Sequence, residues 1–341
     1  MGSISIPAGD LTALAARAFE CAGLSARHAQ VAASALVLTD LMGISTHGVF
    51  RLSRCIELIR LGLINPSPNI TIDENGPAIA TLDGDNGLGL VVAEAGLSQA
   101  LRRARETGLG FATVRNSSHF GAAGIYGFLA AQADMIAIIG TNASPSMAPF
   151  GGRDRKLGNN PLAIGAPRRD AFPLILDMAI SVAARGKFRK LRDLGQPLPE
   201  GWALDVDGVP TTDPEQGLAG FIQFIGGHKG SGLSLMIDLL AGVLSGGAFL
   251  SDTRDMWQQE RPMRTSHFFL VIDPSRLMDM TTYFDRVEAF SAEINSCRPF
   301  EEGGEVLLPG EVEGRAHARQ TAEGVEIPDT VHAELRALAS A

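Results

Sequence analysis

Apolar side chains recur along the chain with two different spacings. Over residues 8–62, small and aliphatic side chains recur at helical intervals, and Ser25 is the predicted N-cap of a second helix. A third helix is predicted from Val49 to Leu61, because Gly62 and the prolines that follow are typical of a helix end and a loop. The N-terminal part of the chain therefore predicts a group of helices.

The middle of the chain predicts strands separated by helices. Short apolar segments bounded by turn residues predict strands at 77–83, 110–116, 135–142 and 267–274, and within LGNNPLAIGAPR and FPLILDMA. Helices are predicted at 91–107, from Ser117 or Ser118 onward, at 181–194, after GGHKGSG, at 281–296 and at the C-terminal end. Strands in the middle, with helices gathered at both ends, predict an α/β fold.

Composition narrows the class of protein. The chain has 341 residues, of which 45% are apolar and 20% charged, as expected for a globular protein of about two domains. A net charge of −9 argues against a nucleic-acid partner, which needs clustered Lys and Arg. Residues 233–244 are too short, and too polar at Asp238, to span a membrane.

The cysteines and the N-terminus predict a cytoplasmic location. Cys21, Cys55 and Cys297 are an odd number of widely spaced thiols, which argues against a disulfide framework and fits a reducing compartment. The N-terminal MGSISIPAGD lacks a basic segment followed by an apolar one, so no signal peptide is predicted.

Several common site motifs do not occur in the sequence. It contains no GxGxxG between a strand and a helix, no GxxxxGK[ST] and no GxSxG. HExxH and CxxC are also absent, so no metal site is predicted. Any nucleotide must therefore be bound without the usual Rossmann or P-loop sequence.

The segment STHGVFRL is the first candidate for chemistry. His47 and Arg51 are four residues apart, so on a helix both side chains share one face. A histidine exchanges protons near neutral pH, and an arginine holds a carboxylate by two hydrogen bonds. The pair suits a small carboxylate substrate that gains or loses a proton, but taken alone it favours an ordinary helix start with a satisfied histidine and a solvated arginine.

A second histidine lies in NSSHFGAAG. Asn116, Ser117 and Ser118 are typical N-cap residues, which predicts that His119 lies in the first turn of a helix. There the helix dipole would lower the proton affinity of His119 and favour a nearby anion. The alternative is a capped helix that happens to contain a histidine.

Three further loops have the composition of ligand contacts. TNASPSMAPFGG follows a predicted strand, and GGHKGSG places Lys229 just before a helix. In DMAISVAARGK the strand is expected to end near Asp177 and a helix to begin near Ser181, where a phosphate could bind with help from the basic residues Arg185 and Lys187. Ordinary turns and a solvated basic face explain the same residues equally well.

Taken in order, these segments resemble one family. STHGVFRL, NSSHFGAAGIY, GNNPLAIGAPR, DMAISVAARGK, EGWALDVDGVPTTDP, GGHKGSG, HFFLVIDP and LLPGE follow one another as in the malate/L-lactate dehydrogenase family of the non-Rossmann type. That family also includes ureidoglycolate, sulfolactate and diketogulonate enzymes and the piperideine- and pyrroline-2-carboxylate reductases. The resemblance covers about residues 5–335.

The resemblance implies a fold, a cofactor and an assembly. The expected fold is an α/β, non-Rossmann NAD(P)-binding type with a largely antiparallel central sheet and with helices from both chain ends packed together. Residues 1–115 with 280–341 are expected to form the helical, dimerisation and substrate-binding domain. Residues 116–279 are expected to form the NAD(P)-binding domain, with a small helical insertion at about 181–225. Homodimers or dimers of dimers are expected, with the active site near a subunit interface.

The resemblance also implies roles for individual residues. His47 matches a proton donor, Arg51 the arginine that binds the substrate carboxylate, and His119 a second histidine named as acid/base in some members. Ser45 and Thr46 accompany them as substrate-binding residues. The positions expected to contact NAD or NADP are Ser144, Asp177, Met178, Ala179, Lys229, Pro309, Gly310 and Glu311.

This sequence departs from the family pattern at four positions. Ile180 and Ser231 replace the usual residues of DMATS and GHKGYG, and Ser53 stands where Pro is frequent. Cys55 lies where many members have a tyrosine near the substrate, so the departure bears on the substrate rather than on the reaction type.

The expected reaction is hydride transfer between NAD(P)H and a small 2-oxo acid of the malate or lactate kind. Reduction of a cyclic imino acid is the alternative within the family. A ligand-binding protein that has kept the fold without the activity is the alternative outside it.

Overall fold

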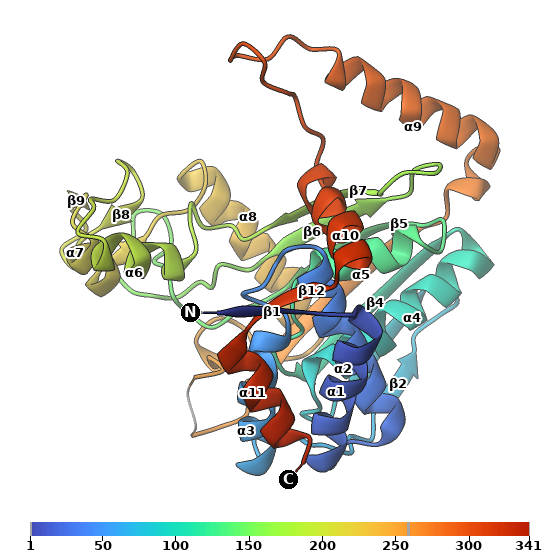
Figure 1. Cartoon of the computed structure of the whole chain (residues 1–341), viewed down its shortest axis with the longest axis horizontal. Helices are drawn as coiled ribbons and strands as arrows, with labels where there is room; N and C mark the ends of the chain where they lie inside the picture. The colour runs from blue at the N-terminus through green and yellow to red at the C-terminus, as the bar shows by residue number, and fades with distance from the viewer. Residues whose placement is uncertain (1, 258–259, 341) are drawn as a thin grey trace.

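The computed structural model describes residues 2–257 and 260–340, and a seven-stranded sheet forms its centre (Figure 1). In spatial order the strands are β2 (Thr71–Glu74), β3 (Ile79–Asp83), β4 (Leu109–Ser117), β11 (Thr265–Ile272), β5 (Ile136–Thr141), β6 (Leu162–Ala166) and β7 (Leu174–Met178). Neighbouring strands are antiparallel, except that β3 and β4 are parallel. The expected α/β fold with a largely antiparallel sheet is confirmed.

Two helices, α4 (Gly89–Thr107) and α5 (Gly124–Ala131), pack on the sheet and on each other. Glycines let α5 approach the sheet directly, since a Cβ at Gly165 of β6 would lie 2.3 Å from the carbonyl oxygen of Gly127. The helix α8 (His228–Asp238) continues as a π-helical turn, η2 (Leu239–Val243), which contacts β4, β11 and β5. The central strands are therefore covered by helices.

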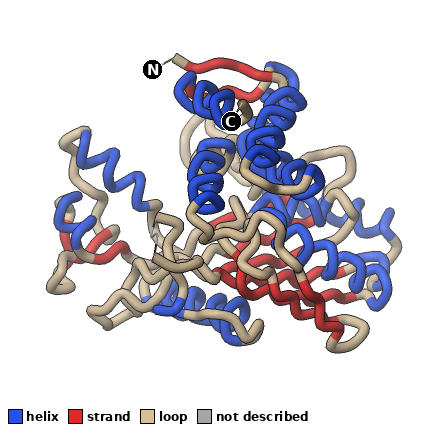
Figure 2. The backbone as a smooth tube through the Cα atoms, turned by 90° about the horizontal axis from the view of Figure 1, so that it is seen from below, coloured by secondary structure: helices blue, strands red, loops and turns tan. Residues whose placement is uncertain are grey.

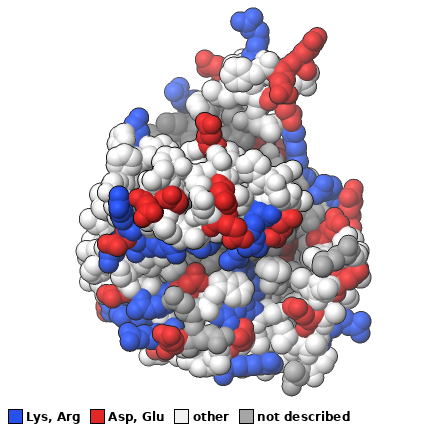
Figure 3. All heavy atoms as spheres, turned by 90° about the vertical axis from the view of Figure 1, so that its left-hand side faces the viewer, with Lys and Arg blue, Asp and Glu red and all other residues white. Residues whose placement is uncertain are grey.

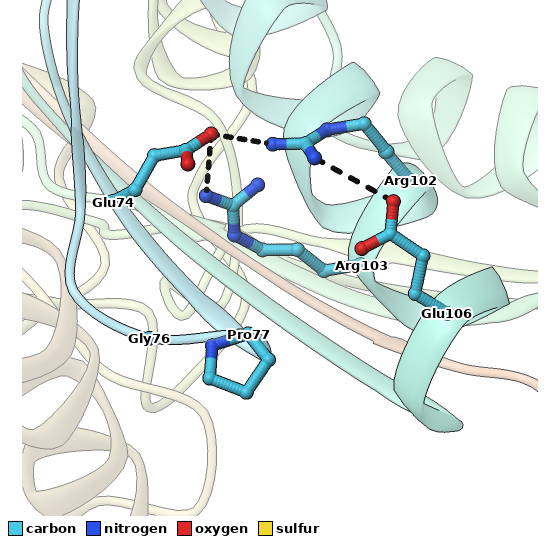
Figure 4. A pocket seen from close by; sticks show the side chains of 6 residues that line it. All are labelled: Glu74, Gly76, Pro77, Arg102, Arg103 and Glu106. Carbon is cyan, nitrogen blue, oxygen red and sulfur yellow. Dashed lines mark hydrogen bonds and ion pairs between the residues drawn. The ribbon is translucent and has the colours of Figure 1, made fainter.

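A polar cluster fastens the edge hairpin β2–β3 to α4 (Figure 4). Glu74 lies 2.8 Å from Arg102 and 3.5 Å from Arg103, whose side chain is only 2% exposed. Arg102 also pairs with Glu106 at 3.5 Å. The cluster lines a hollow of about 280 Å³. Because Glu74 forms an ion pair with the buried guanidinium of Arg103, we infer that the cluster attaches the hairpin to the helix.

The two ends of the chain are built into one helical layer (Figure 2). Strand β1 (Ser3–Ile6) pairs antiparallel with β12 (Val325–Pro328), and this small sheet was not predicted. The helices of this layer are α1 (Ala8–Cys21), α2 (Ala26–Leu41), α3 (Leu52–Arg60), α10 (Glu311–Glu323) and α11 (Asp329–Leu338). Helices from both ends pack together as expected, and Ser25 caps α2 by accepting the His28 amide.

A small lobe stands beside the sheet and contains α6 (Arg185–Asp193), α7 (Pro214–Ala219), β8 (Ala203–Leu204), β9 (Pro210–Thr211) and β10 (Phe221–Ile222). Phe188 and Leu198 are buried in its interior, within an apolar cluster that also contains Ile237 from the end of α8. Figure 3 faces this side and shows basic side chains interspersed with acidic ones.

Helix α9 (Met280–Asn295) extends away from the sheet like an arm (Figure 1). It follows the 3-10 turn η4 (Pro274–Arg276). Ion pairs at 2.8 Å join Arg168 to Glu288 and Arg169 to Asp285, so the arm is attached by charges at its base. Farther along, Phe290 and Ile294 are exposed.

Two predicted helix starts are wrong. The helix expected from Ser117 or Ser118 begins at Gly124, because Asn116 takes a left-handed conformation and the Ser118 hydroxyl instead accepts the Gly89 amide at the start of α4. His119 consequently lies in a loop and not in a first helical turn. The helix expected from residue 181 begins at Arg185, because Ser181 instead forms an isolated antiparallel β-bridge with Phe224.

Candidate active site

The STHG segment forms a turn between α2 and the 3-10 helix η1 (Val49–Arg51). The Val49 amide donates at 2.7 Å to the side chain of Asp40, the penultimate residue of α2. Gly48 packs on the same carboxyl, since a Cβ there would lie 1.9 Å from Asp40 Oδ1. Burial raises the pKa of Asp40 to about 7. The turn that carries His47 is therefore built on a buried acid.

His47 and His119 face each other although 72 positions separate them in the sequence. Their rings are stacked with centroids 5.5 Å apart and planes 24° apart. His47 Nδ1 lies 2.9 Å from Thr46 Oγ1, and His119 Nδ1 accepts the Gly121 amide at 3.2 Å. A neutral ring that accepts at Nδ1 carries its proton on Nε2, so the hydrogen bond assigns His119 the Nε2–H form.

Arg51 lies beside this pair with its guanidinium half-buried. Its Nε donates to the Thr46 carbonyl at 2.8 Å, and Nη1 lies 3.5 Å from the Met256 sulfur. The guanidinium carbon is 5.7 Å from the ring centroid of Trp257. A thioether is a weak acceptor, so a carboxylate would be a far better partner for the same N–H groups.

The environment keeps both histidines neutral near pH 7. Burial, and secondarily the charge of Arg51, lowers the pKa of His47 to about 4. Burial also holds the pKa of His119 well below its usual value, with further lowering from His47, Arg51 and His267. A neutral imidazole accepts a proton at the nitrogen that carries none, so His47 is able to act as a base in the ligand-free protein, whereas the unprotonated Nδ1 of His119 already accepts the Gly121 amide.

Two other predicted substrate residues and one departure lie on the same segment. Ser45 and Thr46 are both exposed on the turn. Cys55 is buried one helical turn beyond Arg51, and burial raises the pKa of its thiol to about 12. The thiol is thus protonated and chemically quiet, and it leaves more space than a tyrosine would.

The DMA segment lies at the end of β7, with Met178 and Ala179 partly exposed. Asp177 accepts the Gly124 amide at 2.8 Å and so caps α5 from a distant part of the chain. Although the residue is exposed as a whole, its carboxyl lies among protein atoms, and this raises its pKa to about 6. The contact connects the predicted cofactor segment to the loop of His119.

The PGE segment docks against the start of the same strand. The Pro309 carbonyl accepts the Ile175 amide at 3.0 Å, and Gly310 has a φ of +93°. A Cβ at Gly310 would lie 2.8 Å from Ile175 N, so glycine is required by both conformation and space. Glu311 folds back to accept the Leu308 amide at 2.9 Å. DMA and PGE are therefore brought together on β7.

Ser144 and Lys229 lie on two segments that contact each other. Ser144 donates to Asp255 at 3.2 Å in the loop after β5. Farther along this loop, the Phe150 amide donates to Ser231 in the first turns of α8, at 3.0 Å. Lys229 is exposed in the first turn of α8, and no side chain caps that helix. An uncapped N-terminus beside an exposed lysine suits a phosphate group.

Arg185 and Lys187, which the sequence suggested as phosphate ligands, make contacts within the small lobe. Arg185 donates to the Leu218 carbonyl at 2.7 Å, and the Lys187 ammonium is 5.2 Å from the ring centroid of Trp202. These contacts join α6 to its neighbours in the lobe.

Sequence reasoning missed three residues that contact the predicted site. Asp40 supports the STHG turn, Met256 approaches Arg51, and His267 is fully buried beside the His119 loop. Asp40 and His267 could have been recognised from the sequence, since each is a polar residue within a largely apolar helix or strand. Met256 had none, because its approach depends on a contact between segments 205 residues apart.

The described residues contain neither a metal-binding cluster nor a helix that could span a membrane. Within 2–257 and 260–340, no group of three or more His, Cys, Asp or Glu side chains is arranged to hold a metal ion. In the same part of the chain, no helix combines the length and apolar character needed to cross a bilayer.

The chain belongs to the malate/L-lactate dehydrogenase family, whose model matches residues 6–336. A malate dehydrogenase of Pyrococcus horikoshii is 39% identical over 316 residues, covering 90% of this chain and 87% of that protein. A (2R)-3-sulfolactate dehydrogenase (NADP⁺) of Chromohalobacter salexigens is 36% identical, with coverage of 96% and 95%. A ureidoglycolate dehydrogenase (NAD⁺) of Escherichia coli K12 is 33% identical, with coverage of 91% and 89%.

Solved structures agree with this membership. The sulfolactate dehydrogenase of Methanocaldococcus jannaschii superposes with a TM-score of 0.92 at 35% identity, covering 99% of this chain and 97% of that one. A Δ1-piperideine-2-carboxylate reductase of Pseudomonas syringae superposes with a TM-score of 0.88 at 29% identity, with coverage of 98% and 99%. The fold is thus shared by relatives named for C–OH and for C=N substrates.

Proposed function

We propose that this chain is an NAD(P)-dependent oxidoreductase that interconverts a small 2-hydroxy acid and the corresponding 2-oxo acid. The observation that carries the proposal is the stacked pair of neutral histidines beside the guanidinium of Arg51. Malate, sulfolactate and ureidoglycolate, which name three relatives, are all 2-hydroxy acids, and this supports the same substrate class.

The division of labour follows from the geometry. Arg51 binds the substrate carboxylate, and Met256 gives up its weak contact with the guanidinium when the carboxylate arrives. His47 accepts the hydroxyl proton during oxidation and returns it to the carbonyl oxygen during reduction. His119 stacks on the His47 ring and keeps it in position. When bound, the nicotinamide cofactor would accept the hydride in oxidation and donate it in reduction.

The cofactor is proposed to be NAD or NADP, held by the three segments described above. Lys229 and the uncapped start of α8 suit its phosphates, and this is the feature of the chain that fits a dinucleotide without a GxGxxG loop. Ser144, the DMA residues and the PGE residues complete the proposed contacts. A fluorescence titration tests this directly, since a protein that binds neither NADH nor NADPH would be a ligand-binding relative without the activity.

The experiment that tests the catalytic proposal is His47→Ala. General acid–base catalysis contributes about 10²–10⁴-fold, so turnover is expected to fall by that factor while the affinity for NAD(P)H is retained. His119→Ala, measured beside it, reports which of the two histidines transfers the proton. A loss of less than about tenfold in His47→Ala would show that the role proposed for His47 is wrong, and a large loss in His119→Ala would then assign the transfer to His119.

Reduction of a cyclic imino acid is the second candidate function. It is favoured by the likeness to the piperideine-2-carboxylate reductase, and an imine nitrogen needs less help from a protein acid than a carbonyl does. Oxidation of NADH and NADPH with pyruvate, oxaloacetate, sulfopyruvate and piperideine-2-carboxylate separates the two, because only an imine reductase prefers the last compound.

We also propose a homodimer or dimer of dimers in the cytoplasm, with residues 1–115 and 280–341 forming the dimerisation and substrate domain and 116–279 the cofactor domain. Exposed apolar side chains support association with another copy. They occur on α8 and η2 and on the arm, at Leu235, Met236, Val243, Phe290 and Ile294. Light scattering after size exclusion measures the mass of the assembly.

A further inference from the structure

His267 is a buried histidine to which the proposed reaction assigns no role. It lies in β11, between β4 and β5, with a side chain that is 0% exposed. Its Nδ1 lies 2.7 Å from Thr141 Oγ1, and its Nε2 lies 2.8 Å from Ser117 Oγ. Thr141 is the last residue of β5 and Ser117 the last residue of β4, so one ring joins the ends of two strands.

The neighbouring carbonyl groups decide which way these hydrogen bonds run. Thr141 Oγ1 lies 3.0 Å from the carbonyl oxygens of Asn142 and of Ser266, and a carbonyl only accepts. The single hydroxyl proton of Thr141 is thus donated to a carbonyl, so His267 Nδ1–H donates to Thr141. Burial lowers the pKa of His267 to about 3, and the neutral ring then accepts the Ser117 hydroxyl at Nε2.

These contacts hold the residues on both sides of His119. Ser117 precedes the His119 loop, and Phe120 follows directly after His119. The Phe120 ring stacks on His267 with centroids 4.5 Å apart and planes 8° apart. The strand itself is adapted for this, since a register shift in β11 between Thr265 and His267 interrupts the pairing with β4. Bulges of this kind re-aim side chains near active sites.

We propose that His267 is a positioning residue for His119, acting through the hydrogen bond that its Nε2 accepts from Ser117. The inference rests on the proposed function, because it gives His119 an orientation that matters for proton transfer. Its direct consequence is structural: with the loop held, His119 Nδ1 stays in place to accept the Gly121 amide, and the ring keeps its proton on Nε2.

Four substitutions separate the contacts of His267. The amide of His267→Gln reaches the position of Nε2 and keeps the Ser117 bond, whereas the shorter amide of His267→Asn reaches only the position of Nδ1 and keeps the Thr141 bond. His267→Phe keeps an aromatic ring against Phe120 and loses both hydrogen bonds. Ser117→Ala removes the same Nε2 bond from the other side and leaves His267 intact.

The primary measurement is the ¹⁵N spectrum of histidine-labelled, ligand-free protein, with His119 assigned by comparison with His119→Ala. The wild-type protein and His267→Gln are expected to show His119 only as the Nε2–H form. His267→Asn, His267→Phe and Ser117→Ala are expected to show a mixture of both ring forms. Unchanged Nε2–H in all variants would overturn the proposal, as would equal behaviour of the Gln and Asn variants.

Turnover of oxaloacetate with NADH and NADPH provides the second readout. Where the wild type is active, His267→Phe is expected to lower kcat about tenfold and leave the substrate KM within about threefold. This loss is smaller than the full contribution of general acid–base catalysis, about 10²–10⁴-fold, because His119 is still present but less well positioned. In a His119→Ala background it should cause no further loss, and an additive loss would contradict action through His119. Normal turnover of His119→Ala alone would refute the role of His119 in the proposed function, whereas the spectrum would still report on its position.

Discussion

At the scale of single residues, the pKa values of the histidine pair predict a pH profile. Because the free-protein pKa of His47 is about 4 and that of His119 is also lowered, the neutral base is present throughout the range above about pH 5. kcat/KM for hydroxy-acid oxidation, which reports on the free enzyme, is expected to be level from pH 5 to 8 and to fall below pH 5. An acid limb near the ordinary histidine pKa of about 6.5 would contradict burial of a neutral pair.

In the opposite direction the protonated histidine is needed, so kcat/KM for reduction of the 2-oxo acid is expected to decline as pH rises. The decline approaches tenfold per pH unit above the free-protein pKa, because each unit removes nine-tenths of the remaining imidazolium. The two directions measured on one preparation are each other's control. A reduction profile that rises with pH would refute a histidine acid in this site.

Arg51 predicts a separate effect on substrate binding. A lysine keeps the charge and loses the two-pronged geometry, so Arg51→Lys is expected to raise the substrate KM about 10–100-fold, with a smaller change in kcat and an unchanged affinity for NAD(P)H. Arg60→Lys, on the exposed end of α3, is the matched control and should resemble the wild type. Equal KM values for both variants would remove Arg51 from the carboxylate site.

At the scale of elements, the STHG turn depends on close packing between Gly48 and α2. Gly48→Ala places a methyl group onto the Asp40 carboxyl, so the turn or the acid must move. The free energy of unfolding is expected to fall by about 1–3 kcal/mol, and turnover is expected to fall more than tenfold because His47 adjoins the displaced residue. Thermal melting and steady-state kinetics measure the two effects.

Gly9→Ala is the matched control for this substitution. Gly9 lies in the first turn of α1, and an added Cβ there meets no atom within 4 Å. Alanine favours helix over glycine by about 1 kcal/mol, so this variant is expected to be as stable as the wild type or slightly more so. If Gly48→Ala and Gly9→Ala had the same melting temperature and the same turnover, the close contact of Gly48 with Asp40 would not be needed for stability or activity.

The contrast between α4 and α5 shows what local sequence predicts about elements. Helix α4 begins within two residues of the predicted start, because its apolar pattern is long and regular. Helix α5 begins several residues later than predicted, because its cap is Asp177 from β7, and Ser118 caps a different helix. Cap residues are recognised from local sequence, whereas these two caps act across 53 and 29 positions.

At the scale of the whole molecule, the order of the family motifs predicted more of the architecture than the periodicity of apolar residues did. Periodicity predicted most helices and strands, while the antiparallel sheet followed only from the family resemblance. The pairing of β1 with β12 was missed, because four-residue strands at opposite ends of the chain carry no local signal of their contact. His47 and His119 were each ambiguous in the sequence, and their stacking required the fold to bring the turn after α2 beside the loop after β4.

Helix α10, in the C-terminal part of the chain, supports the candidate active site. Gln320 is 7% exposed, and its amide donates to the carbonyl oxygens of Asp40 and Leu41, at 2.6 and 3.2 Å. Its Oε1 accepts the Glu326 amide at 3.2 Å. One side chain thus joins α2, which carries the acid beneath the STHG turn, to the strand that pairs with the N-terminus.

Gln320→Met keeps the length of this side chain and removes its polar atoms. Because buried polar groups then lack partners, the free energy of unfolding is expected to fall by about 1–3 kcal/mol, measured as a lower thermal midpoint. Turnover is expected to fall as well, since the end of α2 loses its anchor. Arg319→Met, on the exposed neighbour, should change neither quantity. If the Gln320 variant melted like the wild type, α10 would have no part in holding the candidate site.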